Sequence, residues 1–181
     1  EICNQVLNFQ PKSLIMIDSS ESNLYFLEQE IIQTQFRKKS LEIKLILGNV
    51  KDFYFVKNIF KENSIDIVFH AAAYKHVPLV ESNPNQGIYN NVISTHILCE
   101  ESFKANVERF IFVSTDKAVR PTNIMGASKR LSEQIVLEFS KTKYKKNSQD
   151  FKNHTCFSLV RFGNVLGSSG SVVPLFSKQI R

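Results

Sequence analysis

The stretch Arg109-Phe-Ile-Phe-Val-Ser-Thr-Asp-Lys117 joins a short apolar run to a group of polar side chains. The apolar run, residues 109–114, has the length and composition that predict a buried β-strand. A helical pattern follows over 122–144, just after Pro121. A buried strand that leads into a helix is the repeating unit of parallel α/β sheets. The stretch therefore predicts one strand of a parallel sheet, with polar residues at its carboxyl end, where such sheets bind ligands.

The alternation of strand and helix continues in both directions from this stretch. The pattern predicts further strands over 13–18, 42–47, 65–70 and 156–162, and further helices over 1–9, 20–38, 52–60 and 85–104. The apolar side of the first helix is expected to carry Ile2, Val6 and Phe9. Strict alternation implies a parallel sheet with helices on both faces. We therefore expect an α/β protein with a Rossmann-like, doubly wound parallel sheet.

The two ends of the chain indicate part of a larger domain. A helical pattern begins at residue 1 without an initiator Met or a preceding cap, and an apolar stretch, 172–176, lies near the other end. In the usual strand order 3-2-1-4-5-6, the first strand and its Gly-rich loop would precede the strand that ends at Asp18. We expect residues 1–181 to be a partial NAD(P)-binding Rossmann domain lacking this strand and loop, with the substrate-binding part beginning at about residue 164. Such a fragment is expected to bind NAD poorly and to be inactive on its own.

The composition is that of an ordinary folded domain. Of the 181 residues, 43% are apolar and 22% are charged, which excludes a disordered chain. No apolar run approaches the ~18 residues of a membrane-spanning helix, so we expect no membrane segment in this chain and a cytoplasmic location. The net charge of +6 favours anionic partners such as phosphates and nucleotide sugars. Its spread over distant positions does not favour a nucleic-acid partner.

The thiols and imidazoles do not follow a disulfide or metal-binding pattern. Cys3, Cys99 and Cys156 are odd in number and widely spaced, which indicates reduced thiols. His70 and His76 lie close in sequence, but no third ligand accompanies them. We expect no metal site.

The polar residues that follow the strand over 109–114 are the strongest candidates for chemistry. Ser114, Asp116 and Lys117 lie at its carboxyl end. Met125 and Lys129 follow one turn apart, on the same face of the next helix. An adjacent acid and base can exchange protons with neighbouring atoms of a substrate. The alternative is a helix start followed by a solvent-exposed lysine, which accounts for Lys129 alone but not for the whole cluster.

Three further segments have both a binding interpretation and a purely structural one. Asp18 ends a strand where a carboxylate would accept hydrogen bonds from a ribose, or would cap the next helix. The small residues Ala71–Ala73 would let a cofactor approach the backbone, or would let a helix pack closely. The Gly- and Ser-rich segment 161–171 would hold a diphosphate, or would form a flexible loop.

Taken in order, several stretches resemble the extended short-chain dehydrogenase/reductase superfamily and, within it, the CapD-like nucleotide-sugar 4,6-dehydratases of bacterial polysaccharide biosynthesis. The matching stretches are Asp18–Glu21, His70–Pro78, Asn91–Thr95, Ser114–Val119, Pro121–Lys129 and Arg161–Gly167. The superfamily normally carries Tyr-x-x-x-Lys, whereas Met125 stands here in the place of the tyrosine, with Lys129 in register. This resembles the methionine-containing branch, which acts on UDP-N-acetylglucosamine.

The resemblance implies a reaction and a role for each residue of the cluster. Lys129 would hydrogen-bond the nicotinamide ribose of NAD, and Thr115 with Asp116 would contact the 4-hydroxyl of the sugar. Lys117 would remove the C5 proton, and Asp116 would protonate the departing 6-hydroxyl. Met125 cannot exchange a proton, so another group must take the proton of the 4-hydroxyl. The cofactor is recycled and not consumed.

The resemblance also implies the residues that bind the cofactor and the UDP-sugar. The cofactor would contact Asp18, Asn49, Val50, Ala71, Ala72, Ala73, Asn91, Ser114 and Lys129. The UDP-sugar would contact Lys75, His76, Asn164, Ser168 and Ser171. Asp18 favours NAD over NADP because a carboxylate repels a 2′-phosphate, whereas Asn49 stands where the pattern more often has Asp. In its full length the protein is expected to be a homo-oligomer, and membrane segments outside this chain are left open.

Two other functions stay open at this point. A nucleotide-sugar 4-epimerase of the same fold would keep the C6 hydroxyl that a dehydratase removes. A non-catalytic Rossmann-like binding module would not need the intact set of Asp116, Lys117 and Lys129.

Overall fold

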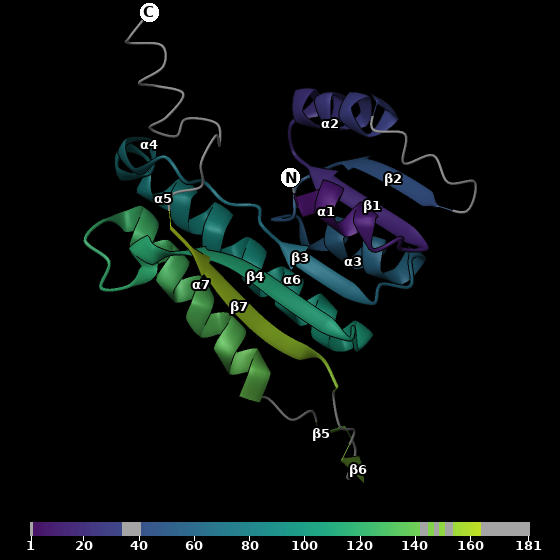
Figure 1. Ribbon diagram of the computed structural model, residues 1–181. Coiled ribbons are helices and arrows are strands. Elements are labelled where there is room, and N and C mark those ends of the chain that lie inside the picture. Colours follow the sequence, from purple (N-terminus) through teal and green to yellow (C-terminus); the bar gives the residue numbers. More distant parts are fainter. Residues whose placement is uncertain (1, 34–40, 142–144, 147–148, 151–153, 164–181) are drawn as a thin grey trace, which may run out of the picture. The chain divides into compact units, whose positions relative to one another are not determined.

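The structure of the protein is a computed structural model that describes residues 2–33, 41–141, 145–146, 149–150 and 154–163 (Figure 1). The chain divides into two compact units, residues 1–58 and 59–181. Three of the residues expected to bind the UDP-sugar, Asn164, Ser168 and Ser171, lie outside the described residues.

The first unit is built around a pair of parallel strands. β1 (Ser13–Asp18) lies beside β2 (Glu42–Leu47), and the two strands pair over their whole length. The helices of this unit are α1 (Ile2–Asn8), α2 (Glu21–Gln33) and the start of α3 (Phe53–Glu62). Leu7 of α1, Met16 of β1 and Ile31 of α2 form a buried core between the strands and the helices.

The buried side of α1 differs from the predicted one. Leu7 is 2% exposed, whereas Ile2 is 38% and Phe9 is 85% exposed. Cys3, one turn before Leu7, packs against the same core. The buried side therefore runs through residues 3 and 7, and the helix ends at Asn8, before Phe9.

The second unit is a three-stranded parallel sheet with helices packed on it (Figure 1). β4 (Arg109–Thr115) lies between β3 (Ile67–His70) and β7 (Cys156–Phe162). The helical elements are α4 (Val77–Ser82), α5 (Pro84–Ile88), the π-helical turn η1 (Tyr89–Ile93), α6 (Ser94–Ala105), the 3₁₀ turn η2 (Asp116–Ala118) and α7 (Ile124–Lys141). A short antiparallel pair, β5 (Lys145–Lys146) and β6 (Gln149–Asp150), precedes β7. The strand neighbours within each unit are those of the predicted order, which confirms a parallel α/β fold.

Phenylalanine side chains fill the space between the second sheet and its helices. The ring of Phe157 in β7 lies 6.5 Å from that of Phe103 in α6 and 5.7 Å from that of Phe139 in α7. Phe110 of β4 is fully buried, and its ring lies 5.4 Å from that of Phe157. Both helices therefore cover the same face of the sheet, and α7 lies along β4 and β7.

The predicted helix over 85–104 is interrupted by a π-helical turn. α5 leads into η1, and α6 follows. Two hydroxyl groups bind backbone carbonyls at this point, because Ser94 Oγ donates to Asn90 O and Thr95 Oγ1 donates to Asn91 O, the latter at 2.7 Å. A π-helical turn inserts one residue, which apolar periodicity alone does not show. The preceding helix α4, with Pro78 in its first turn, is absent from the prediction.

The other helix and strand boundaries move by a few residues. β3 begins at Ile67 and not at 65, β4 continues to Thr115, and α7 lies within the predicted range 122–144. Nowhere in the part of the chain that the structure describes is a helix both long and apolar enough to cross a membrane.

Candidate active site

The expected hydroxyl, acid and base lie together at the carboxyl end of β4. Thr115 is the last residue of the strand, and Asp116 and Lys117 begin the turn η2. Thr115 Oγ1 donates to Asp116 Oδ1 at 2.9 Å and accepts from the Lys117 amide at 3.3 Å. Lys117 Nζ lies 3.4 Å from the same oxygen of Asp116. Both charged side chains are exposed, so the cluster is open to a substrate.

These contacts set the charge of Asp116. The hydrogen bond from Thr115, together with the nearby positive charge of Lys117, lowers the pKa of the Asp116 carboxyl. Asp116 is therefore ionised at neutral pH in this arrangement and is ready to accept a proton. It can donate a proton only after it has taken one from another group.

The first turns of α7 bring Met125 and Lys129 to the same end of the sheet. A Cβ atom at Gly126 would come within 2.3 Å of the Lys117 carbonyl oxygen, so the helix packs directly against the turn that carries Lys117. Met125 is 3% exposed and Lys129 is 6% exposed. The two side chains share the buried side of α7, as their spacing predicts.

The ammonium group of Lys129 is held inside the protein. Its Nζ donates to the Val113 carbonyl at 2.7 Å and lies 4.1 Å from the centre of the Phe112 ring. Burial lowers the pKa of Lys129 to about 8, against an opposing effect of the Glu133 carboxylate. Lys129 is therefore protonated at pH 7 and loses its charge in mildly alkaline solution. The alternative interpretation as a solvent-exposed lysine is wrong.

His70, at the end of β3, is an uncharged residue of the core. It is 2% exposed, and its Nε2 lies 3.0 Å from Thr95 Oγ1. Burial, and then the charge of Lys129, lower the pKa of His70 to about 3. His76, the other imidazole considered for metal binding, is exposed. Within the described ranges, no three His, Cys, Asp or Glu side chains are grouped so that they could hold a metal ion.

Asn91 ties the segment after β3 to α7. Its side chain accepts from the Tyr74 amide at 2.8 Å, and it donates to the Tyr74 carbonyl at 3.1 Å and to Ser128 Oγ at 2.9 Å. Asn91 is 1% exposed, so its effect on a cofactor would come from holding this segment in place. Ala71 and Ala72, at the start of the segment, are exposed, and Ala73 is half-buried.

Lys75 and His76 line a cavity of about 500 Å³ beside α4 and α5. The other residues that line it are Ala73, Tyr74, Leu79, Val80, Asn83 and Gln86. The structure therefore places the two expected sugar-binding residues on one surface feature. This cavity and the cluster at the end of β4 have no lining residue in common among those described.

Ser114 faces away from the cluster at the end of β4. Side chains alternate along a strand, and Ser114 is 4% exposed and donates to Glu133 Oε1 at 2.7 Å. Arg161, which lies opposite Ser114 in β7, also binds Glu133. Glu133 is absent from the predicted site residues. Its one signal in the sequence is its position four residues after Lys129, on the same side of the helix.

In the first unit, Asp18 and Asn49 lie at and just beyond the carboxyl ends of two neighbouring strands. Asp18 Oδ1 accepts from the Ser20 amide at 2.8 Å, and Oδ2 accepts from Asn23 Nδ2 at 3.2 Å. Asn49 Oδ1 accepts from the amide two residues later at 3.0 Å, and Val50 is half-buried. Asp18 therefore binds the residues at the start of α2, in agreement with the structural interpretation of this carboxylate. Each of its oxygens keeps a lone pair for a ribose hydroxyl.

Comparison with known proteins places the whole chain in one family. The family described as "Polysaccharide biosynthesis protein" matches residues 1–181. The chain belongs to this family. It is 39% identical to the capsular polysaccharide biosynthesis protein CapD of Staphylococcus aureus, over 99% of this chain and 28% of that protein. The resemblance to the CapD-like proteins is thereby confirmed.

The chain is also similar to two proteins named as nucleotide-sugar enzymes and to the solved structure of Pen. The chain is 33% identical to the UDP-N-acetylglucosamine 4,6-dehydratase (inverting) of Campylobacter jejuni, over 96% of this chain and 47% of that protein. The solved structure of Pen from Bacillus thuringiensis has a TM-score of 0.84 and 34% identity, over 99% of this chain and 51% of that one. The UDP-glucose 4-epimerase of Bifidobacterium longum, solved with NAD+ and UDP, has a TM-score of 0.59 and 28% identity, over 70% of this chain and 41% of that one. The chain thus spans about half, or less, of the length of these proteins.

Proposed function

We propose that the protein is an NAD-dependent nucleotide-sugar 4,6-dehydratase, which acts on UDP-N-acetylglucosamine in bacterial surface polysaccharide biosynthesis. The observation that carries the proposal is the open cluster of Thr115, Asp116 and Lys117 next to the helix turn that buries Met125 and Lys129. A tyrosine-dependent enzyme carries a tyrosine in the place of Met125 and exchanges a proton through its hydroxyl. The thioether of Met125 cannot exchange a proton. The 33% identity to a UDP-N-acetylglucosamine 4,6-dehydratase supports the same reaction.

Within the second unit, residues near the carboxyl ends of β3 and β4 suit a nicotinamide nucleotide. Ala71 and Ala72 are small and exposed, which leaves the backbone accessible to a cofactor. The Lys129 ammonium uses one donor on the Val113 carbonyl and keeps others for a ribose hydroxyl. Asp18 favours NAD over NADP because its carboxylate repels a 2′-phosphate. When bound, NAD accepts a hydride from C4 of the sugar and returns it to C6.

The proton transfers are assigned to residues of the cluster. Asp116 starts ionised and accepts the proton of the sugar 4-hydroxyl through Thr115, which donates to it at 2.9 Å. Lys117 passes an ammonium proton to water, and its amine then takes the C5 proton. Asp116 gives its proton to the departing C6 oxygen, which leaves as water. Lys117 returns the C5 proton when the hydride reaches C6. Its amine then takes back from water the proton that it released at the start, so both residues recover their starting charges.

A second candidate function is 4-epimerisation of a UDP-sugar. The 28% identity to the UDP-glucose 4-epimerase solved with NAD+ and UDP favours this candidate. The two reactions share the oxidation at C4 and differ at C6. A dehydratase eliminates the C6 hydroxyl as water, whereas an epimerase keeps it and inverts C4.

The test is incubation of the full-length protein with NAD and UDP-N-acetylglucosamine, followed by proton NMR of the sugar. A new C6 methyl signal, with loss of the C4 proton, supports the dehydratase. A C4 epimer with an intact C6 hydroxymethyl group identifies the epimerase, and unchanged substrate with NAD bound excludes both. Asp116→Asn is the matched control, because it keeps an acceptor for Thr115 but cannot carry a proton.

A further inference from the structure

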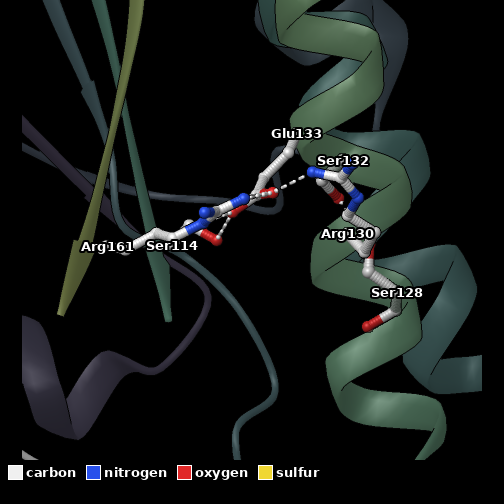
Figure 2. A network of polar contacts seen from close by, with 6 residues as sticks. All are labelled: Ser114, Ser128, Arg130, Ser132, Glu133 and Arg161. Carbon is white, nitrogen blue, oxygen red and sulfur yellow. Dashed lines mark hydrogen bonds and ion pairs between the residues drawn. The ribbon is translucent and has the colours of Figure 1, made fainter. Parts of the chain in front are cut away.

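A buried carboxylate, Glu133, follows Lys129 by about one helical turn on α7. Figure 2 shows Glu133 with its polar partners. Glu133 is 0% exposed on α7. Its Oε1 accepts from Ser114 Oγ at 2.7 Å and from Arg161 Nε at 2.8 Å. Its Oε2 accepts from Arg161 Nη2 at 2.7 Å and from Arg130 Nη1 at 3.1 Å. Each oxygen therefore accepts two hydrogen bonds, which a buried charge requires if it is not to destabilise the fold.

The partners of Glu133 join the helix to two strands. Ser114 of β4 and Arg161 of β7 lie opposite each other in the sheet. Figure 2 shows both side chains pointing from the strands toward Glu133, and the guanidinium of Arg161 binds the carboxylate through two nitrogens. Ser114 directly precedes Thr115, the first residue of the open cluster. The hydrogen bond from Ser114 to Glu133 therefore holds β4 against α7 at the residue before the cluster.

α7 is attached to β4 at two successive residues. Lys129 Nζ donates to the Val113 carbonyl at 2.7 Å, and one turn later Glu133 accepts from Ser114. These two polar contacts, one helical turn apart, add to the apolar packing of α7 on the sheet and oppose both sliding and rotation of this part of the helix. Lys129 and Glu133 therefore bind the same strand from successive turns of α7.

Glu133 also acts on the charge of Lys129. Its carboxylate opposes the effect of burial on the pKa of Lys129. Other charged groups on the elements around Lys129 include Arg130 on α7, Arg161 on β7, Asp116 and Lys117 in η2, and Glu81 of α4, whose carboxylate accepts from the Ile124 amide at the start of α7, while His70 on β3 is uncharged. Glu133 is thus the buried negative charge of this group.

We propose that Glu133 is a positioning residue of the candidate active site, which holds Lys129 against the carboxyl end of β4 by binding Ser114 and Arg161. Glu133 does not contact the substrate or the cofactor in this role. This role of Glu133 depends on the proposed function only in the test that measures turnover of the UDP-sugar.

The first test measures the titration of Lys129 in the full-length protein. The protonation of Lys129 is followed from pH 6 to pH 10 by NMR of protein labelled with ¹³C at the lysine Cε, in the wild type and in Glu133→Gln. The glutamine keeps the size of the side chain and removes its charge, so we expect the midpoint for Lys129 to fall by about half a pH unit or more. Arg130→Gln is the matched control, because it removes only the longest of the four bonds, and its midpoint should move less. An unmoved midpoint in Glu133→Gln would overturn the proposal.

The second test measures turnover of the UDP-sugar. In Glu133→Gln we expect kcat to fall by about tenfold or more, with KM changed by less than about threefold, because Lys129 moves while the residues expected to bind the UDP-sugar do not. Glu133→Asp separates position from charge. It keeps the carboxylate among the arginines, but it is too short to reach Ser114 and Arg161 together, so kcat should fall with the Lys129 midpoint nearly unchanged.

The outcomes separate this proposal from the proposed function. Glu133→Asp covers the case in which Glu133→Gln does not fold, and wild-type kcat in the aspartate variant would overturn the positioning role. If the wild type does not turn over the UDP-sugar, the proposed function fails. The Lys129 midpoint still decides the role of Glu133 in that case.

Discussion

Ser114 and Thr115 are neighbours in β4, yet they belong to two regions with opposite properties. In the outer region, Thr115–Lys117, Thr115 is half-buried, and the ion pair between Asp116 and Lys117 is exposed to water. An ion pair of this kind contributes about 0–1 kcal/mol to stability. The inner region, formed by Ser114, Arg161 and Glu133, surrounds a carboxylate that is 0% exposed. The alternation of side chains along one strand separates the two regions.

The comparison shows how a single strand end can serve both chemistry and support. Residues of the outer region can gain or lose a proton, or change partner, without unfolding the protein. Residues of the inner region cannot, because a buried charge that loses its partner destabilises the fold by several kcal/mol. We therefore expect substitutions in the outer region to lower activity with little effect on stability, and substitutions in the inner region to lower stability as well as turnover.

Removal of the proposed base has the largest expected effect on the reaction. Lys117→Ala should lower kcat by about 10²- to 10⁴-fold, the usual contribution of a general base. The free energy of unfolding should change by less than about 0.5 kcal/mol, because the side chain is exposed. The NMR assay and urea unfolding measure the two quantities. Lys61→Ala, at another exposed lysine, is the control, and wild-type turnover in Lys117→Ala would show that this residue is not the base.

Protonation of the buried Glu133 carboxylate should lower the free energy of unfolding. Burial alone would raise the pKa of Glu133, but the hydrogen bonds from Arg161, Ser114 and Arg130 lower it from 4.5 to about 2. A carboxylate with a lowered pKa contributes stability that is present above pH 4.5 and is lost as the pH falls through about 2. This loss should be about 3 kcal/mol. Urea unfolding between pH 6 and pH 2 should show it in the wild type and not in Glu133→Gln, and equal slopes in both proteins would contradict it.

The hydrogen bonds of Asn91 should have a smaller effect. Asn91→Ala removes the partners of the Tyr74 amide and carbonyl, with an expected loss of about 1–3 kcal/mol. The amide of Tyr74 should also exchange its hydrogen faster, because the segment after β3 loses its attachment to α7. Hydrogen exchange followed by mass spectrometry measures this, with Asn85→Ala at an exposed position as the control. Unchanged exchange at Tyr74 would show that Asn91 does not hold the segment.

The smallest expected change concerns His70. With a pKa lowered to about 3 by burial and by Lys129, its imidazole stays uncharged from pH 5 to pH 8. Its ring proton signals in NMR should therefore not shift over this range. A titration of His70 near pH 6.5 would mean that the end of β3 is more open to water than its 2% exposure indicates.

Much of the fold could be predicted from short apolar runs, because strands buried between helices are uniformly apolar. The runs over 109–114 and 156–162 locate β4 and β7 to within a residue. The apolar side of α1 was not predictable in the same way, since residues 2, 6 and 9 fit helical spacing as well as residues 3 and 7 do. Only the contact of Leu7 with Met16 and Ile31 decides between them.

The candidate site divides along the same line as the two regions. The outer region follows from local sequence, because Thr115, Asp116 and Lys117 are consecutive and end a strand. The inner region depends on a contact between residues 28 positions apart, Glu133 and Arg161. A glutamate four residues after a lysine on a helix indicates an exposed ion pair when only the sequence is considered. Its burial follows from the pairing of β4 with β7, which places Ser114 and Arg161 opposite each other.

The central claim, that the cluster after β4 serves a 4,6-dehydration, is tested most directly by the fate of the hydrogen on C4. Full-length protein would be given UDP-N-acetylglucosamine labelled with deuterium at C4, and the product would be followed by deuterium NMR. The proposed reaction predicts that the label appears in a new C6 methyl group, because the hydride removed from C4 returns to C6. Label that stays at C4 of a sugar with an intact C6 hydroxyl would contradict it.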